Sequence, residues 1–156
     1  LNKLFEILNR ANKRYKLSWN PGGRELGLLK NRQLEIAQIP CEVFAVNREE
    51  WNILEGVRDQ ILTNVPQVVI TDGSKGCEII IKGFSKHFDT KKVDSVDDTG
   101  AGDAFITAYV AAQLRGELPE TAVKWAIANS TSVIQNVGAK PGLLRLGDME
   151  KLQNVQ

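Results

Sequence analysis

The 156-residue chain is 42% apolar, which is enough to bury one hydrophobic core in a compact domain. Its 20 Lys and Arg residues are balanced by 19 Asp and Glu residues, so no excess of one charge favours nucleic acid or an anionic membrane as a partner. We therefore expect small-molecule partners. Two cysteines, Cys41 and Cys77, lie in apolar stretches without metal-ligand spacing. This arrangement argues against zinc and against a disulfide framework, and it favours the reducing cytoplasm.

The sequence shows no signal for a membrane partner. Its apolar runs are shorter than the roughly 18 residues that cross a bilayer, and no basic-then-apolar leader opens it. The first residue is Leu1 rather than Met, so we expect a piece of a longer protein.

Hydrophobic periodicity and turn residues predict alternating helices and strands. In the first half we expect a helix at 2–14, a strand at 16–19, a break at 20–23, a helix at 24–31, a strand at 42–46 and a helix at 48–62. In the second half we expect a buried strand at 67–71, a turn at 72–76, strands at 77–82 and, near an edge, at 86–93, a buried helix at 104–115, and a helix at 119–137 capped by Gly138. This order predicts an α/β fold with a partly parallel sheet, folded as one unit over residues 1–156.

The most informative segment is VDSVDDTGAGDAF at 93–105, which leads directly into the helix at 104–115. Small residues at 100–102 let the backbone approach an anion, and the N–H groups of a helix's first turn favour negative charge. Asp103 would repel a phosphate there unless it has another task. In phosphoryl transfer that task is to accept the proton of the attacking hydroxyl. The alternative is that Asp103 only caps the helix, but a cap does not require three small neighbours.

Four motifs, in order, resemble landmarks of the PfkB (ribokinase-like) carbohydrate kinase family. They are Asn20-Pro21, Asn47-x-x-Glu50, the VITDGSKG turn at 69–76, and DTGAGDAF at 98–105, which resembles the family's second signature. The resemblance spans essentially the whole chain, whereas family members are usually nearly twice as long. It implies a ribokinase-like three-layer α/β/α sandwich, here a partial domain with a mostly parallel central sheet. The chain would be the C-terminal nucleotide-binding and catalytic portion, without the N-terminal sugar-binding half and lid.

The resemblance also implies roles for individual residues, with ATP and Mg²⁺ as cofactors. Asp103 would be the catalytic base, and the anion hole would be formed by Gly100, Ala101 and Gly102. The residues implied to contact the nucleotide are Asn47, Glu50, Thr71, Gly73, Gly76, Ile127 and Asn129. Among these, Glu50 would reach the magnesium ion through ordered water.

Several of these assignments have a purely structural alternative. The Asn47-x-x-Glu50 spacing fits a capping box on the helix that begins near Arg48, and both interpretations can hold together. The segment 73–76 fits a hairpin connection between two strands. Asn129 fits a solvated or capping amide.

A monovalent cation, K⁺, is a further implication of the resemblance. Its ligands would be mostly backbone oxygens, from Asp97, Thr99, Val133, Asn136 and Gly138. Two departures count against this site. Asp98 stands where the family often has Thr, and Asn136 stands where the family often has a basic residue.

The histidine and the tryptophans add no further site. His87 lies on a polar, alternating strand, so we expect it at the surface without a chemical role. Trp19, Trp51 and Trp125 occupy apolar helix or strand positions, so we expect them in the core.

These observations predict an ATP-dependent kinase that phosphorylates a hydroxyl of a small sugar or nucleoside. The alternative is a truncated, non-catalytic nucleotide-binding module, although a pure binder gains nothing from the Asp103 carboxylate. A dinucleotide-binding oxidoreductase is disfavoured, because Phe105 stands where the GxGxxG motif needs its third glycine. For protein partners, a homodimer and a missing N-terminal half are both open.

Overall fold

The computed structural model describes residues 3, 6, 17–90 and 92–152. The chain divides into two compact units, one within residues 1–89 and the other within 90–156, and each is described by itself. Except for Lys3 and Glu6, the predicted helix at 2–14 lies outside the described residues.

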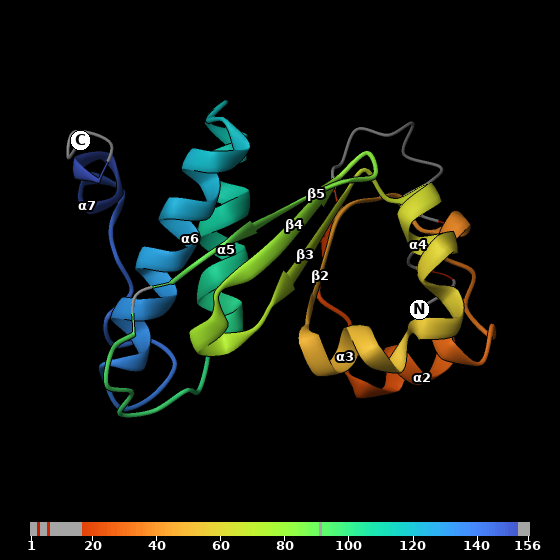
Figure 1. The fold of residues 1–156 in the computed structure, drawn as a ribbon, viewed down its shortest axis with the longest axis horizontal. Helices are drawn as coiled ribbons and strands as arrows, with labels where there is room; N and C mark the ends of the chain where they lie inside the picture. Colours follow the sequence, from red (N-terminus) through yellow and green to blue (C-terminus); the bar gives the residue numbers. More distant parts are fainter. Residues whose placement is uncertain (1–2, 4–5, 7–16, 91, 153–156) are drawn as a thin grey trace. The chain divides into compact units, whose positions relative to one another are not determined.

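The first unit is built on a five-stranded sheet with the order β1-β2-β3-β4-β5. The strands are β1 (Leu17–Trp19), β2 (Cys41–Asn47), β3 (Gln67–Thr71), β4 (Cys77–Ile81) and β5 (Phe84–Phe88). Strands β1, β2 and β3 are parallel, and β4 runs antiparallel to both β3 and β5 (Figure 1). Among these five strands, therefore, only β4 points the opposite way, which confirms a mostly parallel sheet with the fifth strand at its edge.

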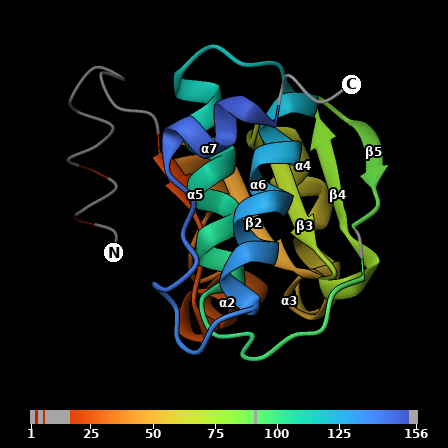
Figure 2. The same ribbon diagram turned by 90° about the vertical axis from the view of Figure 1, so that its left-hand side faces the viewer.

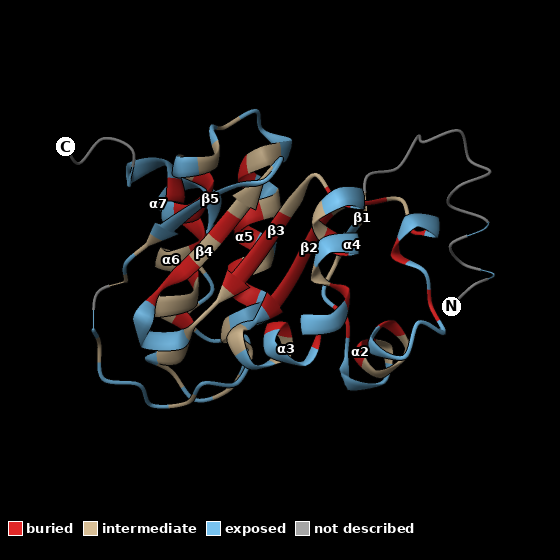
Figure 3. Cartoon of the chain, turned by 45° about the vertical axis from the view of Figure 1, so that its right-hand side comes forward, coloured by how far each residue is buried: buried red, intermediate tan, exposed pale blue. Residues whose placement is uncertain are grey.

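The described helices between β1 and β3 lie on one face of this sheet (Figure 1). They are α2 (Gly23–Lys30), the 3₁₀ turns η1 (Ile36–Gln38) and η2 (Glu55–Val57), α3 (Arg48–Ile53) and α4 (Arg58–Asn64). Alternate strand residues form the core with these helices, including Phe44, Val46, Val68 and Ile70. The residues between them, Val43, Ala45 and Val69, are also buried, so Figure 3 shows β2 and β3 mostly red. Such near-continuous apolar strands are typical of parallel sheets.

The prediction of one continuous helix over 48–62 is wrong. The chain forms α3, η2 and α4 there, and the first helix ends at Ile53. An unbroken helix would pair the carbonyl of Trp51 with the N–H of residue 55. That carbonyl instead accepts hydrogen bonds from Leu54 N (3.2 Å) and from the Arg58 guanidinium (2.8 and 3.0 Å). Gly56, a poor helix former, follows in η2.

The second unit pairs α5 (Ala101–Leu114) with α6 (Pro119–Ile134), which lie side by side (Figure 2), and adds α7 (Leu146–Lys151). Five of the eleven buried residues of α5 and α6 are alanines, which lets two helices approach closely; they are Ala104, Ala108, Ala112, Ala122 and Ala126. Pro119 begins α6, where its missing N–H has no helical partner to lose.

Two predicted boundaries in this unit and one in the first are wrong. Helix α5 begins at Ala101 rather than at residue 104, and β5 spans 84–88 rather than 86–93. Helix α6 ends at Ile134 with Gln135 as its cap, so Gly138 is not the cap. The physical reason is that the carbonyl of Ile134 accepts hydrogen bonds from Val96 N and Asp97 N, at 2.8 and 3.2 Å. Within the described residues, none of the helices has the length and apolar character required to span a bilayer.

Candidate functional site

The candidate residues of the first unit gather where β2 and β3 end. Asn47, the last residue of β2, is in register with Thr71, the last residue of β3. In parallel α/β sheets, ligands bind beyond the carboxyl ends of strands. The structure therefore brings the Asn47-x-x-Glu50 motif and the start of the Thr71–Gly76 turn together at the carboxyl ends of β2 and β3. We call this region the strand edge.

Asn47 and Glu50 form a complete capping box at the start of α3. The Asn47 side-chain oxygen accepts a hydrogen bond from Glu50 N at 2.8 Å, and the Glu50 carboxylate accepts one from Asn47 N at 2.8 Å. The capping interpretation is thus confirmed. The box uses one Glu50 oxygen, Oε2, and does not use the Asn47 side-chain NH₂ group, so a ligand could engage the remaining atoms.

The turn after β3 is closed by its own backbone. Asp72 N donates to the Gly76 carbonyl (2.8 Å), and the Asp72 carbonyl accepts from Lys75 N (3.0 Å) within η3 (Gly73–Lys75). Strands β3 and β4 pair antiparallel on either side, so the hairpin interpretation is confirmed. Gly76 has φ +89°, and an added Cβ would collide with the Phe88 carbonyl oxygen, so this position requires glycine.

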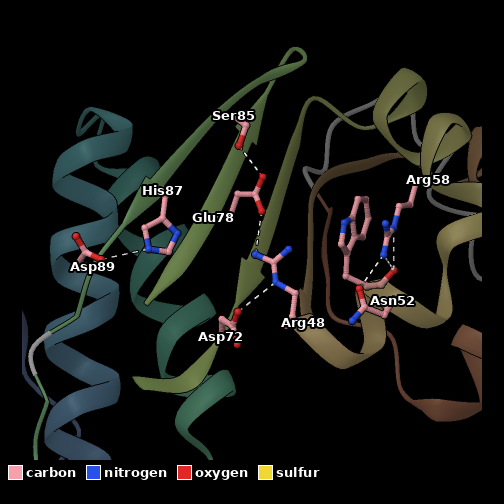
Figure 4. Close-up of polar contacts among 9 residues, drawn as sticks. Arg48, Asn52, Arg58, Asp72, Glu78, Ser85, His87 and Asp89 are labelled. Atoms are coloured by element: carbon pink, nitrogen blue, oxygen red, sulfur yellow. Dashed lines mark hydrogen bonds and ion pairs between the residues drawn. The ribbon is translucent and has the colours of Figure 1, made fainter. Parts of the chain in front are cut away.

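An ion-pair network around Arg48 connects both motifs, and the sequence reasoning missed it (Figure 4). Arg48 Nε lies 3.3 Å from Asp72 Oδ2, and its Nη2 lies 2.9 Å from Glu78 Oε2. The second oxygen of Glu78 accepts a hydrogen bond from Ser85 Oγ at 2.6 Å. The available signal was an arginine directly after Asn47, with acidic residues flanking the glycine turn.

The network shifts the titration of its members. The Ser85 hydrogen bond, followed by the contacts with Arg48, lowers the pKa of Glu78 below its ordinary value. The hydrogen bond to Glu78, ahead of the contacts with Asp72, raises the pKa of Arg48. Glu78 and Arg48 are therefore both charged at neutral pH. The cluster as a whole contains two carboxylates and one guanidinium.

In the second unit, Asp97 ties the loop before α5 to the segment after α6. Its carboxylate accepts hydrogen bonds from Thr99 N at 2.9 Å and from Gly138 N at 2.8 Å. Hydrogen bonds from the Thr99 side chain, then from the N–H groups of Thr99 and Gly138, lower the pKa of Asp97. Both carboxylate oxygens of Asp97 are thus used inside the protein.

Helix α5 begins at a glycine in the left-handed region. Gly100 has φ +81°. A Cβ atom added to Gly100 would lie only 2.9 Å from the Cα atom of Ala139. Ala104 N donates to the Gly100 carbonyl at 2.8 Å and closes the first turn. Only glycine meets both demands, of conformation and of space.

The first turn of α5 presents unpaired N–H groups beside an exposed carboxylate. Among the described residues, the structure gives the N–H groups of Gly100, Gly102 and Asp103 no hydrogen-bond partner, whereas Ala101 N donates to the Asp98 carbonyl at 3.2 Å. The Asp103 side chain is exposed rather than in the core. Unpaired donors at a helix N-terminus are suited to an anion.

Asn129 on α6 is buried, with 3% of its surface exposed, so the alternative of a solvated amide is wrong. Its Nδ2 donates to the Ala104 carbonyl at 2.8 Å, and its Oδ1 accepts from Leu144 N at 2.9 Å. Asn129 therefore links the first turn of α5 to the chain before α7. Ile127 is half-buried on the same helix.

The three tryptophans pack in or against the core, and the histidine lies at the surface. Trp51 and Trp125 are buried in the core, as predicted, and Trp19 packs edge-on against Phe44 with ring centroids 5.6 Å apart. His87 is exposed and lies 3.3 Å from Asp89 (Figure 4).

The described residues bring no three His, Cys, Asp or Glu side chains together as a metal site. Both cysteines are buried, and burial raises the pKa of each thiol to about 12. Such thiols are poor nucleophiles and poor metal ligands, because the thiolate is the reactive form.

Comparison with known proteins gives the family. The model of the pfkB family carbohydrate kinases matches residues 30–144. The chain belongs to the pfkB family. This match includes the Asn47-x-x-Glu50 box, the Thr71–Gly76 turn and the first turn of α5.

Individual relatives agree with this family assignment. The chain is 34% identical over 124 residues to a ribokinase from Arabidopsis thaliana, an alignment that covers 76% of this chain and 31% of the relative. A nucleoside kinase from Methanocaldococcus jannaschii, an archaeal member of the ribokinase family, superposes with a TM-score of 0.77 at 26% identity, covering 94% of this chain and 52% of that one. The ribokinase-like α/β fold is thereby confirmed.

A second solved structure contains ligands. It is a chain assigned as a ribokinase II from E. coli in complex with ATP and Mg²⁺, with a TM-score of 0.79 at 21% identity, covering 99% of this chain and 53% of that one. The pfkB chain spans less than half the length of the curated relatives that it matches, 31% for the ribokinase and 19% for a maize fructokinase. These relatives therefore contain as much sequence again, or more, outside the matched region.

Proposed function

We propose that this chain is the C-terminal, nucleotide-binding and phosphoryl-transferring portion of an ATP-dependent kinase. Its acceptor would be a hydroxyl of a small sugar or nucleoside. The observation that carries the proposal is the first turn of α5, where unpaired N–H groups lie beside the exposed carboxylate of Asp103. A pfkB family match over residues 30–144 supports the same chemistry.

Asp103 would act as the general base of the transfer. Its carboxylate would accept the proton of the attacking hydroxyl, while the N–H groups of Gly100 and Gly102 would donate to the oxygens of the phosphoryl group. Ala101 would join them only by giving up its 3.2 Å hydrogen bond to Asp98. The left-handed Gly100 fixes the direction of these donors before any ligand binds.

The strand edge of the first unit would hold the ATP phosphates and Mg²⁺. The residues present fit this role, because the Asn47 NH₂ group and one Glu50 oxygen stay outside the capping box. A single carboxylate is enough for Mg²⁺, which is usually bound by one or two carboxylates together with water and phosphate oxygens. When bound, Mg²⁺ would neutralise phosphate charge, with Glu50 reaching it through water. Thr71, Gly73 and Gly76 would line the nucleotide.

Two finer assignments stay predictions. Ile127 and Asn129 would lie near the adenine ring, although Asn129 can do so only while its amide also bonds Ala104 and Leu144. A K⁺ ion near Asp97 and Thr99 would need backbone carbonyl ligands, because both Asp97 oxygens already accept N–H donors.

A second candidate function is a non-catalytic nucleotide-binding module. The chain spans only 31% of its ribokinase relative, so an acceptor-binding surface and a cover against water would have to come from elsewhere. This alternative predicts Mg-ATP binding without transfer.

Replacing Asp103 tests the proposal. The chain, and any longer protein that contains it, would be assayed for Mg-ATP affinity and for phosphoryl transfer to a panel of sugars and nucleosides. Asp103→Asn should lower the transfer rate by roughly 100- to 10,000-fold while Mg-ATP affinity changes only a few fold. Asp94→Asn, an exposed carboxylate in the preceding loop, is the matched control and should transfer normally. Full turnover by Asp103→Asn would refute the assignment.

A further inference from the structure

Arg48 occupies a variable position of the Asn47-x-x-Glu50 motif and joins that motif to the turn after β3. It is the first residue of α3, between Asn47 and Glu50, and its guanidinium extends toward the turn after β3 (Figure 4). Two of its nitrogens bind carboxylates from different elements, Asp72 in the turn and Glu78 on β4. The arginine therefore spans three segments that are far apart in the sequence.

Each of the two acidic residues that Arg48 contacts is held by further hydrogen bonds. The N–H and carbonyl of Asp72 both form backbone hydrogen bonds that close the 72–76 turn. The second carboxylate oxygen of Glu78 accepts a hydrogen bond from Ser85 on β5. The contact with Glu78 therefore anchors the Arg48 guanidinium to strands β4 and β5. A movement of the turn relative to α3 would break the contact between Arg48 and Asp72.

The charges argue against a direct role for Arg48 as a phosphate ligand. One guanidinium faces two carboxylates, so the cluster has an excess of negative charge and does not attract an anion. The side chains of Arg48, Asp72 and Glu78 are 33%, 25% and 25% exposed, so water screens the cluster only in part. Its effect on a nucleotide would therefore come through the position of the turn.

We propose that Arg48 is a positioning residue, which holds the 72–76 turn against the start of α3 so that both motifs meet one nucleotide. The planar guanidinium makes this possible, because its Nε and Nη2 reach two carboxylates at a fixed angle. A lysine ammonium keeps the charge but does not reproduce this fork. The proposal deepens the proposed function, since its ligand is the Mg-ATP assigned there.

The test compares Arg48→Met and Arg48→Lys with Arg58→Met. Arg58 is the matched control, because its guanidinium also bonds within the same unit, to Trp51 and Asn52, and lies 5.1 Å from the Trp51 ring centroid without touching the turn (Figure 4). Two quantities are measured on the full chain: hydrogen exchange at the amides of Asp72 and Gly76, and the Kd for Mg-ATP.

Arg48→Met should speed exchange at Asp72 and Gly76 and weaken Mg-ATP binding, each by roughly three- to tenfold, as expected for a partly exposed, hydrogen-bonded ion pair. Arg48→Lys should restore neither quantity fully. Arg58→Met should leave both unchanged even if it lowers the melting temperature more. Asp72→Asn, which keeps the backbone bonds of the turn, should reproduce the Arg48→Met result and stands in for it if that variant does not fold.

The outcomes separate this proposal from the proposed function. If the wild-type chain does not bind Mg-ATP, the proposed function fails, whereas the exchange rates still decide whether Arg48 holds the turn. Unchanged exchange in Arg48→Met and Asp72→Asn would overturn the positioning role. Full recovery in Arg48→Lys would also overturn it, because charge alone would then be sufficient.

Discussion

The strand edge of the first unit and the helix start of the second unit hold their candidate residues by different physical means. At the strand edge, side-chain contacts hold the candidate residues in place. These contacts are the Asn47–Glu50 box and the Arg48 ion pairs, which are polar and lie near the surface. At the start of α5, backbone conformation and close packing dominate, through Gly100 and the buried amide of Asn129.

This difference predicts different tolerances to substitution. Partly exposed ion pairs and caps contribute about 1 kcal/mol each, because water replaces much of what is lost. A glycine with positive φ packed against backbone, or a buried amide with two partners, has no such substitute. Single substitutions at the start of α5 should therefore lower the free energy of unfolding by more than single substitutions at the strand edge.

The largest expected effect is that of Gly100→Ala. The substitution places a Cβ against Ala139 and forces an L-residue into the left-handed region, so we expect a loss of roughly 2–4 kcal/mol in the free energy of unfolding. Chemical denaturation measures it. Gly102→Ala is the control. Gly102 lies within α5 and an added Cβ would contact no other atom, so this substitution should be neutral or slightly stabilising. Equal effects of the two variants would break the comparison.

Asn129→Leu should follow in size. It removes the partners of the Ala104 carbonyl and Leu144 N in a buried site, so we expect a loss of roughly 1–3 kcal/mol. Denaturation followed by circular dichroism would measure it. The matched change Asn64→Leu, at an exposed amide that bonds only the Gln60 carbonyl, should cost under about 0.5 kcal/mol. A loss below that of Asn64→Leu would mean that the buried amide does not stabilise the second unit.

Asn47→Ala tests the strand edge. Loss of the cap should lower the free energy of unfolding by about 1 kcal/mol, again measured by denaturation. Asn47→Asp keeps an acceptor for Glu50 N and should recover most of this stability. If Asn47→Ala cost more than Gly100→Ala, side-chain contacts would outweigh backbone packing and the comparison would be reversed.

The smallest expected effect is the pH dependence of the Arg48 network. The folded protein lowers the pKa of Glu78 from its ordinary 4.5, so the carboxylate stabilises the fold above that pH and loses this contribution as the pH falls through the folded pKa. The stability difference between wild type and Glu78→Gln should be under about 1 kcal/mol at neutral pH and shrink below about pH 4.5. A difference that grows on acidification would contradict this sign.

The sequence predicted those features that depend on local patterns. The β-branched run at 67–71 forms β3 with the predicted bounds, and the small-residue turn at 100–102 opens α5. The capping box and the β3–β4 hairpin also follow from spacing alone, because both are made by residues close together in the chain.

Contacts between distant residues decided the rest. The end of α6 depends on Val96 and Asp97, which occupy the Ile134 carbonyl from a different part of the chain. The Arg48 network joins segments 24 and 30 residues away, and Asn129 bonds groups 25 and 15 residues away. Local sequence propensities cannot predict such contacts, because these contacts form only after the backbone has brought the partners together. The sequence therefore determined the elements and motifs of this chain, whereas the tertiary structure decided where helices stop and which polar side chains are buried or paired.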